Sequence, residues 1–234
     1  FKGNEYTIKT IVTSELIKKV SESFGVKNYD VFTGFKFIAE KILELEGKEK
    51  YICGGEESYG FSIGDYVRDK DAVSTCCLIA EICAWAEEQG KSFYDILVDI
   101  YHEYGFFKED LLSITIKGIS GAEEIQKMMV SFRTRPPKVL FGLDVVRILD
   151  YQKQISKDLI TGNEEKLNFP QSNVLQFFLE DGSKISVRPS GTEPKIKFYF
   201  GVFNELKNKS EFTELENKAE VKIKAIISEL GLKR

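Results

Sequence analysis

Histidine is nearly absent from this sequence, and its scarcity limits the chemistry that the chain can perform. Of 234 residues only His102 is a histidine, so a metal site built from several imidazoles is excluded. No motif surrounds His102, and we expect it on the surface of a helix. The cysteines are few and lack metal-site spacing, which predicts reduced thiols buried in a core. They are Cys53, Cys76, Cys77 and Cys83.

Long apolar runs and an excess of basic charge are also missing. No run approaches the roughly 20 apolar residues that a bilayer-spanning helix needs, and no signal pattern opens the chain. The net charge is −4, so no overall basic field attracts nucleic acid or an anionic membrane. We therefore expect a cytoplasmic protein with no nucleic acid or membrane partner, in which an anion site must be local. Because the chain begins at Phe1 without a methionine, we also expect that upstream residues have been removed.

The element pattern predicts two domains, residues 1–107 and residues 108–234. Hydrophobic residues make up 42% of the chain, which is ample for two cores. In the first domain, expected strands over 6–12, 29–32 and 50–53 alternate with expected helices between Ser14 and Gly25 and over 35–45. This order predicts an α/β domain with a parallel sheet and right-handed crossovers.

Two polar loops follow strands of this predicted sheet. Thr33-Gly34 follows the second strand, and Gly54–Gly60, which reads G-G-E-E-S-Y-G, follows the third. Ligands of parallel sheets bind outside the carboxyl ends of the strands, so both loops can face one pocket. The two carboxylates and the serine suit the reading of sugar hydroxyls. General acid/base work and a merely solvated turn are the alternatives, whereas two acids alone make a poor cation cage.

Arg68-Asp69-Lys70-Asp71 precedes a helix that we expect over residues 72–88. Asp71 is suited to cap this helix. Lys70 would stand at the helix N-terminus, where its ammonium and the helix dipole both favour an anion. The apolar residues of this helix lie on all of its sides, so we expect the helix to be largely buried. One predicted inner stripe consists of Val73, Cys77, Ala80 and Ala84.

The second domain groups its strands together between helices. A strand is expected from Leu111, a helix over 122–132, and a hairpin over 174–180 that turns at Asp181-Gly182. A final helix is expected to be capped by Ser210 and to end at Gly231. This pattern predicts a small α+β layer.

A seven-residue loop in this domain has the composition of an anion-binding site: Arg188-Pro189-Ser190-Gly191-Thr192-Glu193-Pro194. If its flanking strands are neighbours, Arg188 and Lys197 lie on the same side of the sheet, away from the core. Lys184 and Ser186 are expected on that side too. The loop's amides and hydroxyls and two cations could then close around a phosphate, with Gly191 allowing a close approach. The alternative is a plain turn, for which such residues are typical.

Four motifs together resemble one family, the α-D-phosphohexomutases, and within it the bacterial phosphoglucomutase/phosphomannomutase type. The resemblance covers essentially the whole chain. It implies the third of the family's four domains, slightly short at its beginning, followed by the fourth, which has a TATA-binding-protein-like α+β fold. The motifs, in the family's order, are Thr33-Gly34-Phe35-Lys36, Gly55-Glu56-Glu57-Ser58-Tyr59-Gly60, Arg68-Asp69-Lys70-Asp71 and the loop from Arg188 to Pro194.

The resemblance also implies roles for single residues. Glu56 and Ser58 would hold the sugar hydroxyls. The full substrate-binding set would be Thr33, Gly34, Lys36, Glu56, Ser58 and Lys70. The phosphate that is not being transferred would be bound by Arg188, Ser190, Gly191, Thr192 and Lys197. The family often has arginine in place of Lys197, and lysine keeps the charge but loses the bidentate fork.

Phosphohexomutases are isomerases that transfer phosphate through a bisphosphate intermediate. Their phosphoserine lies in a T-A-S-H-N-P-like loop, their Mg²⁺ is held by a D-G-D-G-D-R-like loop, and neither loop occurs in this sequence. Phosphoryl transfer needs both the nucleophile and the metal. The resemblance therefore implies an inactive C-terminal half, with no catalytic or metal residue. The missing N-terminal domains of the same enzyme would complete it, with hexose phosphate as substrate and hexose 1,6-bisphosphate as activator.

One interpretation of a different class competes with the enzyme. The chain could be a non-catalytic sugar-phosphate-binding or regulatory module that shares these two domains. A serine loop and an acidic metal loop upstream of Phe1 would decide for the enzyme. Glucose and mannose are not distinguished, because the Glu56-Ser58 pair can accept a sugar in more than one orientation.

Overall fold

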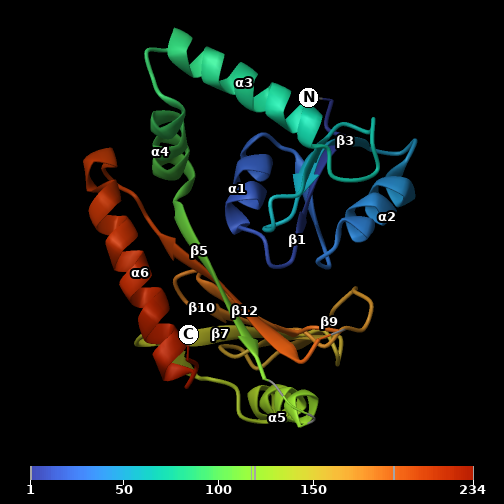
Figure 1. Cartoon of the computed structure of the whole chain (residues 1–234), viewed down its shortest axis with the longest axis vertical. Coiled ribbons are helices and arrows are strands. Elements are labelled where there is room, and N and C mark those ends of the chain that lie inside the picture. Colours follow the sequence, from blue (N-terminus) through green and yellow to red (C-terminus); the bar gives the residue numbers. More distant parts are fainter. Residues whose placement is uncertain (1, 117, 119, 192, 234) are drawn as a thin grey trace. The chain divides into compact units, whose positions relative to one another are not determined.

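The computed structural model describes residues 2–116, 118, 120–191 and 193–233, and it divides into two compact units (Figure 1). The first unit consists of residues 1–107 and 205–212, and the second of residues 108–204 and 213–234.

The segment 205–212 lies against helix α4 (Phe93–Tyr104) of the first unit. Nδ1 of His102 lies 2.8 Å from the carbonyl oxygen of Leu206, and the ammonium of Lys209 pairs with Asp99. The sequence analysis had assigned this segment to the second domain, since nothing in a short loop indicates a partner so far back in the chain. His102 itself is exposed on the helix, as predicted.

A parallel sheet forms the centre of the first unit. Strand β1 (Glu5–Thr10) pairs in parallel with β2 (Lys27–Val31) on one side and with β3 (Lys50–Gly55) on the other. This arrangement confirms the predicted parallel α/β sheet. A short strand that was not predicted, β4 (Phe61–Ile63), pairs antiparallel with β3, so the order is β2-β1-β3-β4.

Two helices cover opposite faces of this sheet (Figure 1), because side chains alternate between the faces along β1. They are α1 (Glu15–Ser23), capped by Ser14, and α2 (Phe35–Leu45). On the α1 side, the hydroxyl oxygens of Ser21 and Thr7 lie 2.8 Å apart. The α2 side is an apolar core of Tyr6, Ile8, Val31, Phe35, Ile38, Ile42 and Tyr51.

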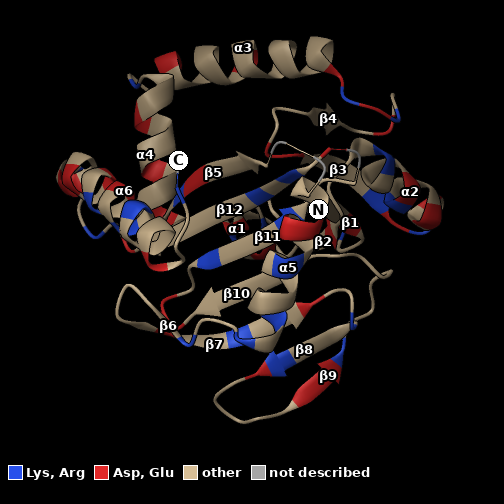
Figure 2. Cartoon of the chain, turned by 60° about the horizontal axis from the view of Figure 1, so that its bottom comes forward, with Lys and Arg blue, Asp and Glu red and all other residues tan. Residues whose placement is uncertain are grey.

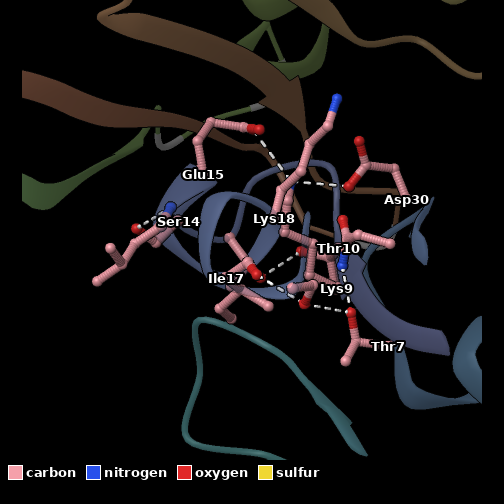
Figure 3. Close-up of polar contacts among 12 residues, drawn as sticks. Thr7, Lys9, Thr10, Ser14, Glu15, Ile17, Lys18 and Asp30 are labelled. Carbon is pink, nitrogen blue, oxygen red and sulfur yellow. Dashed lines mark hydrogen bonds and ion pairs between the residues drawn. The ribbon is translucent and has the colours of Figure 1, made fainter. Parts of the chain in front are cut away.

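Lys9, on the α1 side of β1, is a fully buried cation. Its ammonium lies 2.7 Å from Oδ1 of Asp30 in β2 and 3.0 Å from Oε1 of Glu15 in the first turn of α1 (Figure 3). Burial alone lowers the pKa of Lys9, but the two carboxylates outweigh burial and raise the pKa above its ordinary value. The charged lysine thus joins two strands and a helix.

Helix α3 (Ala72–Glu88) is mostly exposed, contrary to the sequence prediction. It packs one side against β4 and α4, and Ala86 is its only buried residue. The predicted inner stripe lies on the outer side: Val73 is 77% exposed, and Cys77, Ala80 and Ala84 are exposed with it. The prediction was wrong because the helix is apolar on all sides, so periodicity does not indicate which side faces the sheet.

The same error affects the cysteines that were expected to be buried. Cys76, Cys77 and Cys83 are exposed on α3, and Cys53 on β3 is half-buried. Desolvation raises the pKa of the Cys53 thiol to about 11. Cys53 therefore stays protonated near neutral pH and is a poor nucleophile.

The second unit is built on an antiparallel sheet, which confirms the fold class of an α/β part followed by an α+β part. Its strand order is β5-β12-β11-β10-β7-β8-β9, with β6 paired to β7, so it has more strands than the sheet of the first unit. The strands are β5 (Phe106–Thr115), β6 (Val139–Leu140), β7 (Leu143–Asp150), β8 (Ile155–Asp158), β9 (Glu164–Lys166), β10 (Leu175–Leu179), β11 (Lys184–Pro189) and β12 (Lys195–Asn204).

Helix α5 (Gly121–Thr134) packs on β12. The ring of Phe132 lies 5.8 Å, centroid to centroid, from Phe198 and 6.3 Å from Phe177. These aromatic contacts fix α5 on the Val187 face of the sheet, where the side chains of alternate residues are fully buried.

The last helix, α6 (Phe212–Glu229), is preceded by a 3₁₀ turn, η1 (Lys209–Glu211). The predicted cap at Ser210 is wrong. Oδ1 of Asn208 accepts hydrogen bonds from both the N–H and the hydroxyl of Ser210, so Asn208 caps the turn. Either residue type suits a cap, and the sequence does not show where the 3₁₀ turn begins.

Charged residues of both signs are interspersed on α2, α6 and the β8–β9 hairpin (Figure 2). In that hairpin, Nζ of Lys157 lies 2.9 Å from Oε1 of Glu164. Within the part of the chain that the structure describes, no helix combines the length and the apolar character needed to cross a bilayer.

Replacing Lys9 with methionine is expected to lower the free energy of unfolding by about 2–4 kcal/mol, because two carboxylates lose their common cation. Lys18→Met is the matched control, since Lys18 is 46% exposed and pairs with Glu22 at 3.8 Å. Its effect is expected to stay within about 0.5 kcal/mol. Urea denaturation followed by circular dichroism measures both, and equal stabilities of the two variants would contradict the role of Lys9.

Candidate functional site

The two polar loops at the carboxyl ends of β2 and β3 meet through one hydrogen bond. Gly34, between β2 and α2, donates its N–H to Oε1 of Glu56, which follows β3, at 2.6 Å. The φ angle of Gly34 is 125°, a backbone conformation that side chains disfavour and glycine allows. The structure therefore brings the Thr33–Lys36 and Gly55–Gly60 motifs together at one edge of the sheet.

Because Gly60 has no side chain, Lys70 and the Glu56 carboxylate can both lie close to its backbone. The N–H of Glu56 donates to the carbonyl of Gly60 at 2.8 Å, which closes the loop. A Cβ atom on residue 60 would lie only 2.7 Å from Cδ of Lys70 and 3.2 Å from Oε2 of Glu56. Without that atom, the stem of Lys70 and the carboxylate of Glu56 both lie against the loop.

The ammonium of Lys70 is oriented by two neighbours. It lies 2.9 Å from Oδ1 of Asp69 and 5.0 Å from the ring centroid of Phe35. The hydrogen bond to Asp69 raises the pKa of Lys70, and the negative charge of Glu56 acts in the same direction. Lys70 is therefore a permanent positive charge close to the Glu56 carboxylate.

Asp71 caps helix α3, as predicted. Its carboxylate accepts hydrogen bonds from the N–H groups of Val73 and Ser74. These two donors are therefore already used, which leaves the Lys70 ammonium as the main group to attract an anion at this helix N-terminus.

The remaining predicted sugar-site residues have different environments. Ser58 and Lys36 are exposed, and Nζ of Lys36 lies 4.7 Å from the ring centroid of Phe37. The hydroxyl oxygen of Thr33 is buried and has no hydrogen-bond partner among the described residues. A buried hydroxyl without a partner is costly, so this group lacks the hydrogen bond that would offset its burial.

A cleft of about 680 Å³ beside α2 includes only part of the predicted set. Lys36 and Lys70 line it, whereas Thr33, Glu56 and Ser58 do not. Its lining is Phe35, Lys36, Ala39, Glu40, Leu43, Arg68, Asp69 and Lys70.

Glu57 is the second carboxylate of the predicted pair, and in the structure it makes contacts within the protein. Its Oε2 accepts hydrogen bonds from the hydroxyls of Thr10 at 3.0 Å and Thr13 at 3.3 Å. Both threonines lie where β1 ends. Hydroxyl residues at the carboxyl end of the strand between the two loops were the available signal.

Arg188 and Lys197 are direct cross-strand partners in the β11–β12 ladder, so their side chains lie on the same side of the sheet, as predicted. Neither side chain has an ion-pair partner among the described residues. This face is not solvent-exposed along its length, however. Ser186 and Lys184 are buried, and the Ser186 hydroxyl accepts a hydrogen bond from Gln176 at 2.8 Å. The non-core assignment was wrong for these two residues, because a polar alternation does not distinguish solvent from a hydrogen-bonded interior.

The loop between these strands is closed by its own backbone. The N–H of Ser190 donates to the carbonyl of Lys195 at 2.7 Å. Gly191 is exposed, and apart from its chain neighbours no described residue has an atom within 4 Å of the place where its Cβ would be. Packing therefore does not require glycine there, and the backbone is open to an approaching group. Thr192, also predicted to bind phosphate, lies outside the described residues.

Two family models match the chain, and both describe the same enzyme family. Residues 1–104 match the phosphoglucomutase/phosphomannomutase alpha/beta/alpha domain III. Residues 143–219 match the phosphoglucomutase/phosphomannomutase C-terminal domain.

Relatives and a solved structure agree with these matches. The phosphoglucomutase of Staphylococcus saprophyticus is 38% identical over 212 residues, which cover 90% of this chain and 38% of that protein. The phosphoglucomutase of Staphylococcus aureus (strain bovine RF122 / ET3-1) is 40% identical over 192 residues, which cover 82% and 35%. The chain thus spans little more than a third of the length of these relatives.

Among solved structures, parafusin, a phosphoglucomutase from Paramecium in its open form, has the same fold. It aligns with a TM-score of 0.60 at 18% identity over 94% of this chain and 38% of that one. The motifs, the fold and the sequence matches agree: the chain belongs to the phosphoglucomutase/phosphomannomutase family, of which it contains domain III and the C-terminal domain.

Proposed function

We propose that this chain is the substrate-binding part of an enzyme that interconverts hexose 1-phosphate and hexose 6-phosphate. The observation that carries the proposal is the hydrogen bond from Gly34 to Glu56, which joins two family motifs at the carboxyl edge of a parallel sheet. Ligands of such sheets bind at this edge. The identity of 38% to a phosphoglucomutase supports a hexose phosphate as the ligand.

Glu56 would read the hydroxyls of the sugar. Its Oε1 is occupied by the Gly34 N–H, which fixes the carboxylate, and its Oε2 remains to accept from a sugar hydroxyl. The exposed hydroxyl of Ser58 and the unpartnered hydroxyl of Thr33 can each donate or accept. Lys70, with Lys36 in the cleft beside it, would add positive charge for the anionic substrate.

Arg188 and Lys197 would bind a phosphate group of the substrate. Two cations on one side of neighbouring strands, next to an open glycine backbone, would form a site for a dianion. In this proposal Ser190, Gly191 and Thr192 supply the hydroxyls and backbone amides around the phosphate.

The chemical step would take place on residues outside this chain. Among the described residues, no group of three His, Cys, Asp or Glu side chains is placed to hold a metal ion. In a longer cytoplasmic enzyme, N-terminal domains would therefore supply the phosphoserine and Mg²⁺, and a hexose 1,6-bisphosphate would be the intermediate. Such an enzyme is an isomerase that acts by phosphotransfer.

The chain alone is expected to show no mutase turnover, because it lacks both the nucleophile and the metal loop. A coupled assay that follows the formation of glucose 6-phosphate from glucose 1-phosphate, with Mg²⁺ and glucose 1,6-bisphosphate present, measures this. Turnover that copurifies with the chain would contradict the assignment of the chemistry to other domains.

Glucose 1-phosphate is expected to bind weakly and to shift the backbone amide signals of residues 33–36 and 56–60 in an NMR titration. Glu56→Ala is expected to weaken binding at least about tenfold, because a charged hydrogen-bond acceptor is lost. Glu44→Ala, at a carboxylate that is 60% exposed on α2, is the matched control. Absence of binding by the unmodified chain, or equal affinities of the two variants, would contradict the proposal.

Arg188→Ala is expected to weaken glucose 1-phosphate binding by about 1.5–3 kcal/mol, the usual contribution of a charge-assisted contact. Arg188→Lys keeps the charge but loses the bidentate fork, so its affinity is expected to lie between those of the unmodified chain and Arg188→Ala. Arg147→Ala removes an exposed arginine that stacks on Phe178 of the same sheet and is the control. The same titration measures all three, and an unchanged affinity in Arg188→Ala would remove this residue from the phosphate site.

A further inference from the structure

The loop that carries Glu56 is fixed by the next residue rather than by apolar packing. Glu57 reaches back to the end of β1, where its Oε2 accepts from the hydroxyls of Thr10 and Thr13 at 3.0 and 3.3 Å. The two hydroxyl oxygens lie 2.9 Å from each other. Thr10 is fully buried and Thr13 is 7% exposed, so the donors are held by the interior of the unit.

The two hydroxyl donors lie at the end of the strand that runs between the two strands carrying the site loops. β1 lies between β2 and β3, and Thr10 is its last residue. The turn that follows is closed by a hydrogen bond from the Thr13 N–H to the Thr10 carbonyl at 3.0 Å. The two threonines thus form a pair of donors at the end of β1 and in the turn that follows it.

The two adjacent carboxylates bind to two different strand ends. Glu57 attaches the loop after β3 to the end of β1, and Glu56 attaches the same loop to Gly34 beyond the end of β2. Besides these two contacts, the loop is closed by the hydrogen bond from the Glu56 N–H to the Gly60 carbonyl, and no apolar side chain of the loop is buried. Tyr59, the only large apolar side chain within it, is fully exposed and has a φ of 67°.

We propose that Glu57 is a positioning residue that holds the Glu56 carboxylate in the orientation required to read a sugar hydroxyl. Its Oε2 accepts from two buried hydroxyls at the end of β1, so the side chain is held against the interior of the unit and Glu57 acts through its neighbour. The inference rests on the proposed function for the sugar, whereas the tether itself can be tested without any ligand.

The test compares variants that remove either side of the tether. Glu57→Ala removes the acceptor, and the double variant Thr10→Val, Thr13→Val removes both donors while keeping the carboxylate. Glu57→Gln keeps one acceptor oxygen and serves as the partial rescue. Glu44→Gln changes the charge by the same amount at an exposed site of the same unit.

The readout is the amide of Gly34, whose NMR shift and hydrogen exchange report the bond to Glu56. Exchange of this amide is expected to accelerate about tenfold in both tether variants, to accelerate less in Glu57→Gln, and to stay unchanged in Glu44→Gln. The amides of β1 and β2 should keep their protection in all of them. Glucose 1-phosphate affinity is expected to fall three- to tenfold in Glu57→Ala.

Three results would overturn the inference. They are an unchanged Gly34 amide in Glu57→Ala, a loss of protection throughout the sheet equal to that of Gly34, and full glucose 1-phosphate affinity despite a loosened Gly34 amide. If the unmodified chain does not bind the sugar phosphate, the proposed function fails. The Gly34 amide then still decides whether Glu57 positions Glu56.

Discussion

The hydrogen bond between the Gly34 amide and the Glu56 carboxylate is the contact on which the candidate sugar site depends. It requires a backbone conformation at Gly34 that favours glycine, and a loop after β3 that returns tightly enough to present Glu56. The parallel order of the strands makes the contact possible, because it places both loops at the same edge. The alternation of strands and helices in the sequence thus brings the Gly34 amide and the Glu56 carboxylate together.

The first unit has two chemically different interiors. The α2 side of the sheet is apolar and gains its stability from buried surface. The α1 side contains the Lys9 ion pairs and the Thr7–Ser21 contact, whose geometry is directional. A shift of one residue would separate Lys9 from Asp30 and would also turn the apolar side chains of the strand to the other face, so both interiors specify the register. Lys9 and Asp30 each lie one residue before the end of their strand, so the polar side connects the ends of β1 and β2.

Local patterns in the sequence predicted most elements of the fold, and the errors occurred where the answer depends on distant residues. The caps at Ser14 and Asp71 were predicted correctly, because a cap bonds to the next turn of the same helix. The exposed side of α3 was not, since an apolar helix gives no directional signal. The attachment of residues 205–212 to α4 and the partners of Glu57 at Thr10 and Thr13 depend on contacts between segments far apart in the chain.

In the candidate site, too, the sequence predicted which residues take part but not how their side chains are arranged. The motifs predicted Glu56 and Lys70 as site residues, and the structure places both against Gly60. The motifs did not predict that only Lys36 and Lys70 of the set line the cleft beside α2. Motif spacing identifies which residue types occur near a strand end, whereas side-chain direction is decided by the packing of neighbouring loops.

The pairing of Arg188 with Lys197 has an electrostatic consequence for the ligand-free protein. Like charges on directly opposite residues repel each other, so Arg188 and Lys197 oppose the pairing of β11 with β12 at this point, and the charge of Glu193 near Lys197 offsets part of the repulsion. A bound dianion would replace that repulsion with attraction, and dissolved salt would relieve it in part by screening. A phosphate bound at the proposed site would relieve the repulsion between the two cations, so its binding would be coupled to the stability of the ladder.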